Sequence, residues 1–247
     1  MGGQTAIRID RLGKRFGAGP LVLDDVNLSI ETGEFVCLLG ASGCGKSTLL
    51  NLIAGLDRPT TGSIDVPVEG AAVMFQESAL FPWLTAGRNV ELALRLRGVP
   101  RKERRAEAEA LLERVNLKGT YDKRIHELSG GMRQRVALAR ALGQESSVLL
   151  MDEPFAALDA ITRDLLHEEL ERVWRRTGRT IVFVTHNVRE AARLGQRVVL
   201  LSSRPGRVAG EWRIDSTEGR RIESPEVAAL SIEITEQLRK EIRRNAA

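Results

Sequence analysis

The sequence contains few residues of several informative kinds. Only two of its 247 residues are cysteines, Cys37 and Cys44, and only 4% are aromatic. The cysteines lie too close together in sequence to favour a structural disulfide, so a reducing compartment is the expected setting. The low aromatic content argues against a surface that stacks nucleic-acid bases, because such surfaces interleave basic and aromatic side chains.

Long hydrophobic runs and targeting segments are also missing. No apolar stretch approaches the roughly 20 residues that cross a bilayer. The start, MGGQTAIRID, has no cationic segment followed by an apolar one, and it lacks the Ser or Thr of a myristoylation signal at position six. We therefore expect a chain that is soluble by itself and reaches a membrane only through another chain. The net charge of +4 fits an ordinary mixed surface as well as a polyanionic partner.

Apolar runs alternate with helical patterns over much of the chain. The expected strands are residues 34–40, 147–154, 180–186 and 197–202, and the expected helices between and after them include residues 46–54, 159–178 and 187–195. Continuously apolar strands that alternate with helices predict a parallel sheet covered on both faces. Ligands in such sheets lie at the carboxyl ends of the strands.

Three other regions have different patterns. Residues 78–133 are mostly amphipathic and helical, so we expect a helical subdomain inserted into the sheet domain. The N-terminal residues alternate apolar and polar side chains, as half-buried strands do. Near the C-terminus four apolar residues share one face of an expected helix, which predicts docking on the core: Val227, Leu230, Ile234 and Leu238.

The stretch GASGCGKST has the spacing of a phosphate-binding loop. It follows an apolar run and opens a helical pattern, and it consists of Gly40, Ala41, Ser42, Gly43, Cys44, Gly45, Lys46, Ser47 and Thr48. Its glycines allow backbone N–H groups to point inward toward an anion, and the helix start adds partial positive charge. Lys46 is expected to reach the β- and γ-phosphates of a nucleotide, Ser47 to bind Mg²⁺ and Thr48 to make a further phosphate contact. We also expect the helix N-terminus to favour a thiolate at Cys44, so that thiol alkylation inhibits turnover.

Two acidic residues follow the apolar run VLLM. Asp152 ends the expected strand, where a carboxylate can bind Mg²⁺, and Glu153 can polarise a water aimed at the γ-phosphate. By itself this pair is equally consistent with a salt-bridged strand end. Its combination with the glycine-rich loop favours the catalytic interpretation.

The stretch LSGGMRQR predicts a second anion-binding helix start. Ser129 occupies the N-cap position, and Gly130 and Gly131 precede the helical pattern. Because the first loop already surrounds its own nucleotide, the second is best used on the nucleotide of another copy. We therefore expect a head-to-tail pair of chains with ATP between them.

Taken in order, these motifs resemble those of the ATP-binding subunits of ATP-binding cassette (ABC) transporters over nearly the whole chain. The resemblance implies an α/β P-loop NTPase fold of RecA-like type, with a mostly parallel sheet, an N-terminal antiparallel β-subdomain and the inserted helical subdomain. Residues 1–77 and 134–203 would form the nucleotide-binding core of one domain spanning 1–247, and residues 204–247 a final strand and helix. The implied enzyme is an ATPase that uses ATP and Mg²⁺.

The resemblance also implies roles for residues outside these motifs. Phe16 would stack on adenine, although tyrosine is common there and a core phenylalanine is the alternative. Gln76 would contact Mg²⁺ and the attacking water, Asp159 would lie at the dimer interface, and His186 would bond the γ-phosphate. His126 and His167 lack such a context, and we expect them at the surface. Ala157 and Asn187 replace the serine and aspartate that are common in the family, which leaves the catalytic groups intact.

Two stretches, LFPWLTAGRNV and LSSRPGRV, resemble the importer subunits for nitrate, sulfonate, taurine and related solutes. The implied partners are a second copy of the chain, two membrane-spanning permease subunits and, indirectly, a solute-binding protein. The implied location is the cytoplasmic face of the inner membrane. Exposed Phe81 and Trp83 would anchor a short helix of the permease, with core packing as the alternative.

Other classes remain as alternatives. A soluble ABC ATPase acting on nucleic acid or ribosomes usually carries two cassettes or a long coiled coil, and this chain shows neither, so we expect no nucleic-acid partner. The stretch LSGGMRQR and the position of His186 argue against a P-loop kinase or GTPase. An exporter subunit would carry fused membrane spans.

Overall fold

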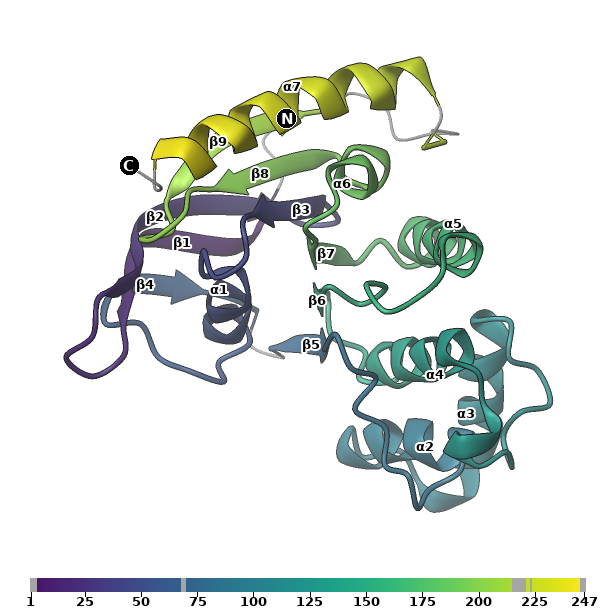
Figure 1. The fold of residues 1–247 in the computed structure, drawn as a ribbon. Helices are drawn as coiled ribbons and strands as arrows, with labels where there is room; N and C mark the ends of the chain where they lie inside the picture. Colours follow the sequence, from purple (N-terminus) through teal and green to yellow (C-terminus); the bar gives the residue numbers. More distant parts are fainter. Residues whose placement is uncertain (1–3, 68–69, 215–220, 223, 245–247) are drawn as a thin grey trace. The chain divides into compact units, whose positions relative to one another are not determined.

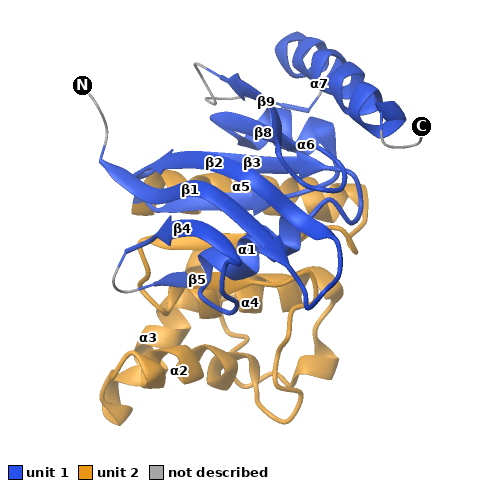
Figure 2. Ribbon diagram, turned by 90° about the vertical axis from the view of Figure 1, so that its left-hand side faces the viewer, with its two compact units in different colours: residues 1–71, 178–247 blue, residues 72–177 orange. Residues whose placement is uncertain are grey.

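The computed structural model describes residues 4–67, 70–214, 221–222 and 224–244. Two compact units divide the chain (Figure 2): unit 1 comprises residues 1–71 and 178–247, and unit 2 comprises residues 72–177. The predicted α/β class is confirmed, and the subdivision at residues 78 and 133 stays a prediction. Among the described residues, no helix is both long and apolar enough to span a bilayer.

Unit 1 contains an antiparallel sheet with the strand order β2-β1-β4 (Figure 1). Its strands are β1 (Thr5–Arg15), β2 (Leu21–Glu31) and β4 (Thr61–Asp65). Every second residue of β2 from Val26 to Ile30 is buried, while Asn27 and Ser29 between them are exposed. This is the alternation that the sequence predicted, because successive side chains of a strand point to opposite faces.

Unit 1 also contains four strands in the order β7-β3-β8-β9, namely β7 (Thr180–Val184), β3 (Phe35–Gly40), β8 (Arg197–Leu201) and β9 (Val208–Arg213). β3 pairs in parallel with β7 and β8, whereas β9 is antiparallel. Every residue of β3 is buried, as expected of a strand inside a parallel sheet. Gly40 stands opposite Leu201, so the segments after β3 and β8 leave the same edge of the sheet.

The described residues of unit 1 also form the helices α1 (Lys46–Ile53), α6 (Val188–Leu194) and α7 (Pro225–Arg244). α7 packs against α6 (Figure 1) and buries Val227 and Ile234, which confirms the predicted docking of the C-terminal helix. Ser231 and Glu241 lie on the same helix face and are buried as well, so the packed face is more polar than its apolar residues alone suggested.

Unit 2 is mainly helical. Its elements are β5 (Ala71–Met74, of which all but Ala71 belongs to unit 2), α2 (Ala86–Leu96), α3 (Arg101–Arg114), the short 3₁₀ helix η1 (Ile125–Glu127), α4 (Gly130–Leu142), β6 (Val148–Asp152) and α5 (Ala160–Thr177). α2, α3 and α4 pack on one another. A side chain at Gly87 would collide with the Tyr121 ring, since its Cβ would lie 2.0 Å from Cδ2.

The prediction that His167 lies at the surface is wrong. Its side chain is completely buried on α5, with the ring centroid 5.6 Å from that of Phe155. The reason is helical periodicity, because His167 shares the buried face of α5 with Leu170 and Trp174. His126 is exposed, as expected.

Candidate nucleotide-binding site

The P-loop (residues 40–48) joins β3 to α1, which confirms the predicted strand, loop and helix. Gly43 and Gly45 have φ angles of 77° and 100°, in the left-handed region that glycine adopts readily. A Cβ at Gly45 would lie 2.7 Å from Leu23 Cδ2, so this turn also has no room for a side chain. The glycines therefore set the curvature of the loop.

Lys46 lies inside the P-loop. Its side chain is buried, and its ammonium donates to the carbonyl oxygens of Gly40 at 2.9 Å and Ala41 at 3.1 Å. Ser47 is exposed and Thr48 is half-buried in the first turn of α1, where backbone N–H groups have no partner within the helix. This lining of N–H donors, an ammonium and a hydroxyl fits a polyphosphate and its metal ion.

The expectation of a thiolate at Cys44 is wrong. Cys44 is buried, and desolvation raises the pKa of its thiol, although Lys46 and backbone N–H groups act in the opposite direction. A Cβ at Gly40 would lie 2.5 Å from Cys44 Sγ, which places the sulfur beneath the loop. Desolvation of the buried thiol raises its pKa by more than the helix N-terminus lowers it.

Phe16 follows β1 and is 54% exposed, which excludes the alternative of a core phenylalanine. The Lys14 ammonium lies 4.7 Å from the centre of its ring and pairs with Asp57 at 2.7 Å. The cation lies over the ring at cation–π distance. The adenine-stacking role of Phe16 stays a prediction.

His186 lies exposed after β7, in a segment held on both sides. The Thr185 N–H donates to the Leu38 carbonyl of β3 at 3.1 Å, and the Asn187 N–H donates to Thr185 Oγ1 at 3.0 Å. Asn187 caps α6 by accepting from the N–H groups of Arg189 and Glu190. Asparagine thus supplies the capping oxygen that an aspartate would supply there.

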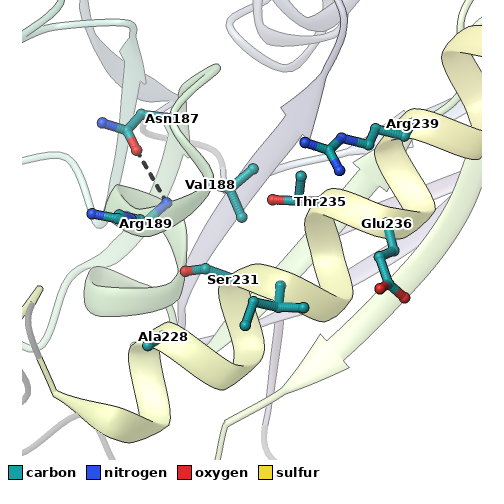
Figure 3. A pocket seen from close by; sticks show the side chains of 9 residues that line it. Asn187, Val188, Arg189, Ala228, Ser231, Thr235, Glu236 and Arg239 are labelled. Carbon is teal, nitrogen blue, oxygen red and sulfur yellow. Dashed lines mark hydrogen bonds between the residues drawn. The ribbon is translucent and has the colours of Figure 1, made fainter.

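A separate cavity of about 420 Å³ lies between the start of α6 and α7 (Figure 3). Its lining includes Val188, Ile232, Ser231 and Thr235, beside Asn187 of the segment that carries His186. None of its lining residues belongs to the P-loop, so the cavity is distinct from the phosphate-binding loop.

In unit 2, Asp152 ends β6 and Glu153 follows it, as predicted. The backbone of Glu153 has a φ angle of 43°, which is uncommon for a residue with a side chain. Such a conformation costs about 1–3 kcal/mol and is concentrated at functional sites. Non-glycine residues elsewhere in the described chain, such as Asn116 and Glu145, also have positive φ angles, so the conformation alone does not assign a role to the carboxylate.

Ser129 caps α4, because its hydroxyl accepts from the Met132 N–H at 3.3 Å. The predicted second helix start is therefore confirmed as a capped helix, with Ser129 and Gly130 exposed. Gly131 allows α4 to approach α5, where a Cβ would lie 2.6 Å from Thr162 Cγ2. Asp159 accepts from the Thr162 N–H at 2.9 Å, a bond that lowers the pKa of its carboxyl.

Gln76 begins a loop whose backbone is held by side chains of α2 and α4. Gln134 donates to the Gln76 carbonyl at 2.9 Å, and buried Asn89 bonds both the N–H and the carbonyl of Phe81. The Gln76 side chain is exposed. Trp83 is 67% exposed and Phe81 half-buried, with ring centroids 5.3 Å apart, so core packing is excluded for Trp83.

Unit 1 thus holds the P-loop with Phe16 and His186, and unit 2 holds Gln76, Asp152 and Glu153 together with the capped starts of α4 and α5. The described residues contain no cluster of three or more His, Cys, Asp or Glu side chains that could hold a metal by themselves.

The sequence motifs did not identify Arg204, whose Nε lies 3.5 Å from the Gly43 carbonyl oxygen. Its stretch, LSSRPGRV, contains no local pattern that indicates contact with the P-loop.

Comparison with known proteins agrees with this geometry. Residues 23–156 match the family described as ABC transporter. The nitrate import ATP-binding protein NrtD of Synechocystis is 49% identical over 83% of this chain and 79% of its own. The taurine import ATP-binding protein TauB of Sinorhizobium fredii is 50% identical over 80% of this chain and 76% of its own.

A solved structure shows the ATP-binding cassette MJ0796 as a dimer in a post-hydrolysis state, bound to ADP and Pi. Its sequence is 34% identical to that of this chain. It matches with a TM-score of 0.73, over 85% of this chain and 99% of that one. Fold and loop together define an ATP-hydrolysing protein of the P-loop class. The chain belongs to the ABC transporter family.

Proposed function

We propose that two copies of this chain bind ATP between them, hydrolyse it and thereby power the import of a small anionic or organic solute. The observation that carries this proposal is the presence in one chain of two different helix starts suited to phosphate, at Lys46 and at Ser129. The first includes a lysine inside its loop, whereas the second is an exposed capped helix. Two copies arranged head to tail would place both helix starts at each nucleotide, the one at Lys46 from one copy and the one at Ser129 from the other.

Unit 1 supplies the groups that bind the nucleotide. The P-loop N–H groups and Lys46 hold the phosphates, Phe16 stacks on adenine and His186 bonds the γ-phosphate. The burial of Lys46 supports its role, because its ammonium is already positioned by the loop carbonyls. Little side-chain freedom is then lost when phosphate binds.

Mg²⁺ would be held by Ser47, Gln76 and Asp152, with water completing its oxygen ligands. This donor set fits the ion, because it contains a carboxylate, a hydroxyl and an amide oxygen and no sulfur. When bound, Mg²⁺ neutralises charge on the phosphate oxygens. The exposed side chains of Ser47 and Gln76 support the assignment, since neither hydroxyl nor amide is confined to the core.

Glu153 accepts a proton from the attacking water, and Lys46 stabilises the charge of the transferring phosphoryl group. The partner copy completes the site with Ser129, Gly130 and Gly131, and Asp159 lies at the interface between the copies. Hydrolysis then breaks the bond to the γ-phosphate and adds the water oxygen, giving ADP and phosphate.

The solute class rests on the relatives. NrtD and TauB, named for nitrate and taurine import, are each about half identical to this chain over most of its length. Two permease subunits would receive the motion through the loop that carries Trp83, whose exposed ring is a suitable anchor. A solute-binding protein would deliver the solute to those permeases on the other side of the membrane.

Glu153→Gln tests the catalytic assignment. We expect unchanged ATP binding and a loss of ATP turnover of about 10²-fold or more, because the amide cannot accept the proton. Exposed Glu168 on α5 provides the matched control, and Glu168→Gln is expected to keep the wild-type rate. A normal rate in the Glu153 variant would remove this residue as the base.

A further inference from the structure

Arg204 lies in the bracing segment (residues 202–207), which joins β8 to β9 in unit 1. Because β8 is parallel to β3 and Leu201 stands opposite Gly40, the bracing segment begins beside the P-loop. The two segments lie more than 150 residues apart in sequence, yet they leave the same edge of the sheet.

The bracing segment is held firmly at several points. The Ser202 hydroxyl donates to the Pro205 carbonyl at 2.9 Å and accepts from the Arg207 N–H at 3.0 Å. The Gly206 N–H donates to the Val22 carbonyl at 2.8 Å, which attaches the segment to β2. These bonds fix the backbone from which the Arg204 side chain projects.

The bracing segment also packs directly on the P-loop backbone. A Cβ at Gly206 would lie 2.2 Å from the Cys44 carbonyl oxygen, so any other residue would push the two segments apart. The Arg204 guanidinium lies against Gly43, with Nε 3.5 Å from the carbonyl oxygen and Nη2 3.0 Å from the place of a Gly43 Cβ.

The charge of Arg204 is not balanced within the described part of the chain. No carboxylate there pairs with its guanidinium, whereas the neighbouring Arg207 forms an ion pair with Asp24. The Arg204 side chain is exposed, so most of its N–H donors face solvent. A guanidinium with free donors is suited to phosphate, which it can bind through two parallel hydrogen bonds.

We propose that Arg204 is a second cation of the phosphate site, which acts with Lys46 by binding the phosphates of the nucleotide held in the P-loop. This inference rests on the proposed function. It assigns a role to the stretch SSRPGR: the serine and glycine hold the segment against the loop, and the arginine adds charge there. Lys46 binds from inside the loop and Arg204 from beside Gly43.

Arg204→Gln removes the charge while keeping much of the side-chain length. We expect the Kd for ATP, measured by calorimetry, to rise about tenfold or more, as the loss of one charge-assisted hydrogen bond implies. The KM for ATP is expected to rise equally, with kcat at saturating ATP within about twofold of wild type. Arg204→Lys, which keeps the charge, is expected to recover part of the affinity.

Exposed Arg213 on β9 provides the control, because Arg213→Gln makes the same change of charge in the same unit. The inference is overturned if the Arg204 and Arg213 variants bind ATP equally well, or if Arg204→Gln lowers the melting temperature and kcat together.

Lys46→Ala separates this inference from the proposed function. Unchanged ATP binding in Lys46→Ala would refute the proposed function, whereas lost binding with a normal Arg204→Gln would refute only the role of Arg204.

Discussion

At the scale of single residues, burial and backbone conformation decide chemistry that sequence motifs do not specify. Cys44 stands among phosphate-binding amides, yet its thiol lies beneath the loop and desolvation raises its pKa. The protonated thiol is not the nucleophile, so the residue is a small buried side chain rather than a reactive one.

We expect slow alkylation of Cys44 by iodoacetamide at pH 7 in the folded protein. The rate is expected to rise as the pH approaches the raised pKa, because the thiolate fraction increases there. Mass spectrometry of labelled peptides measures this rate. The chain unfolded in guanidinium provides the control, in which both cysteines are expected to react as ordinary exposed thiols. Labelling of the folded protein at the unfolded rate would contradict the burial.

Glu153 illustrates a residue whose conformation opposes stability. With a φ angle of 43°, a glycine would fit its backbone better. Glu153→Gly is therefore expected to stabilise the fold by about 1 kcal/mol, a rise of about 2–4 °C in melting temperature, while abolishing turnover.

The substitution Glu168→Gly is expected to lower the stability of the fold, in contrast to Glu153→Gly. Glu168 lies within α5, where glycine is destabilising by about 1 kcal/mol relative to good helix formers. Calorimetric melting of the two variants compares them directly. A lower melting temperature for Glu153→Gly would contradict the prediction that relief of backbone strain outweighs the interactions lost with this residue.

At the scale of elements, the docking of α7 rests on a few side chains. Ile234 is completely buried, whereas Ile232, two positions earlier, is 64% exposed. Ile234→Ala is expected to reduce the free energy of unfolding by about 2–4 kcal/mol, since it leaves a cavity in the packed face.

Ile232→Ala makes the same chemical change at the surface, and we expect an effect of at most about 0.5 kcal/mol. Denaturant titrations followed by circular dichroism measure both values. Equal effects of the two substitutions would show that α7 does not dock through this face.

Elements with strong local patterns were predictable from sequence, and those defined by distant contacts were not. The apolar run before GASGCGKST and the helical pattern after it were sufficient to place β3, the P-loop and α1. By contrast, β4 and β5 have only five and four residues, so their sequences are too short to show a clear periodicity. The position of Arg204 depends on the parallel pairing of β3 with β8, which no local pattern reveals.

His167 and Cys44 were misplaced for related reasons. The sequence shows that a residue is polar or lies near a helix start, but its burial depends on the elements packed around it. The roles of Gln76, Asp159 and His186 came from the resemblance to a family. The structure adds that Asp159 is a helix cap and that exposed His186 follows a firmly held strand end.

At the scale of the whole molecule, the central claim is that each ATP site is shared between two copies. The P-loop lies in unit 1 and the Ser129 helix start in unit 2, and the proposal requires the second to act on the nucleotide of the partner. A bulky cation at position 129 should therefore block pairing of the copies without weakening the binding of ATP to each one.

The most direct test is size-exclusion chromatography with light scattering on the slowly hydrolysing Glu153→Gln chain, with and without ATP. The account predicts dimers that form only with ATP, and monomers when Ser129→Arg is added, with the affinity for ATP unchanged within about twofold. The matched control adds His126→Arg, at an exposed position three residues earlier, and it should still give dimers. Dimers that form with ATP despite Ser129→Arg would contradict the shared site.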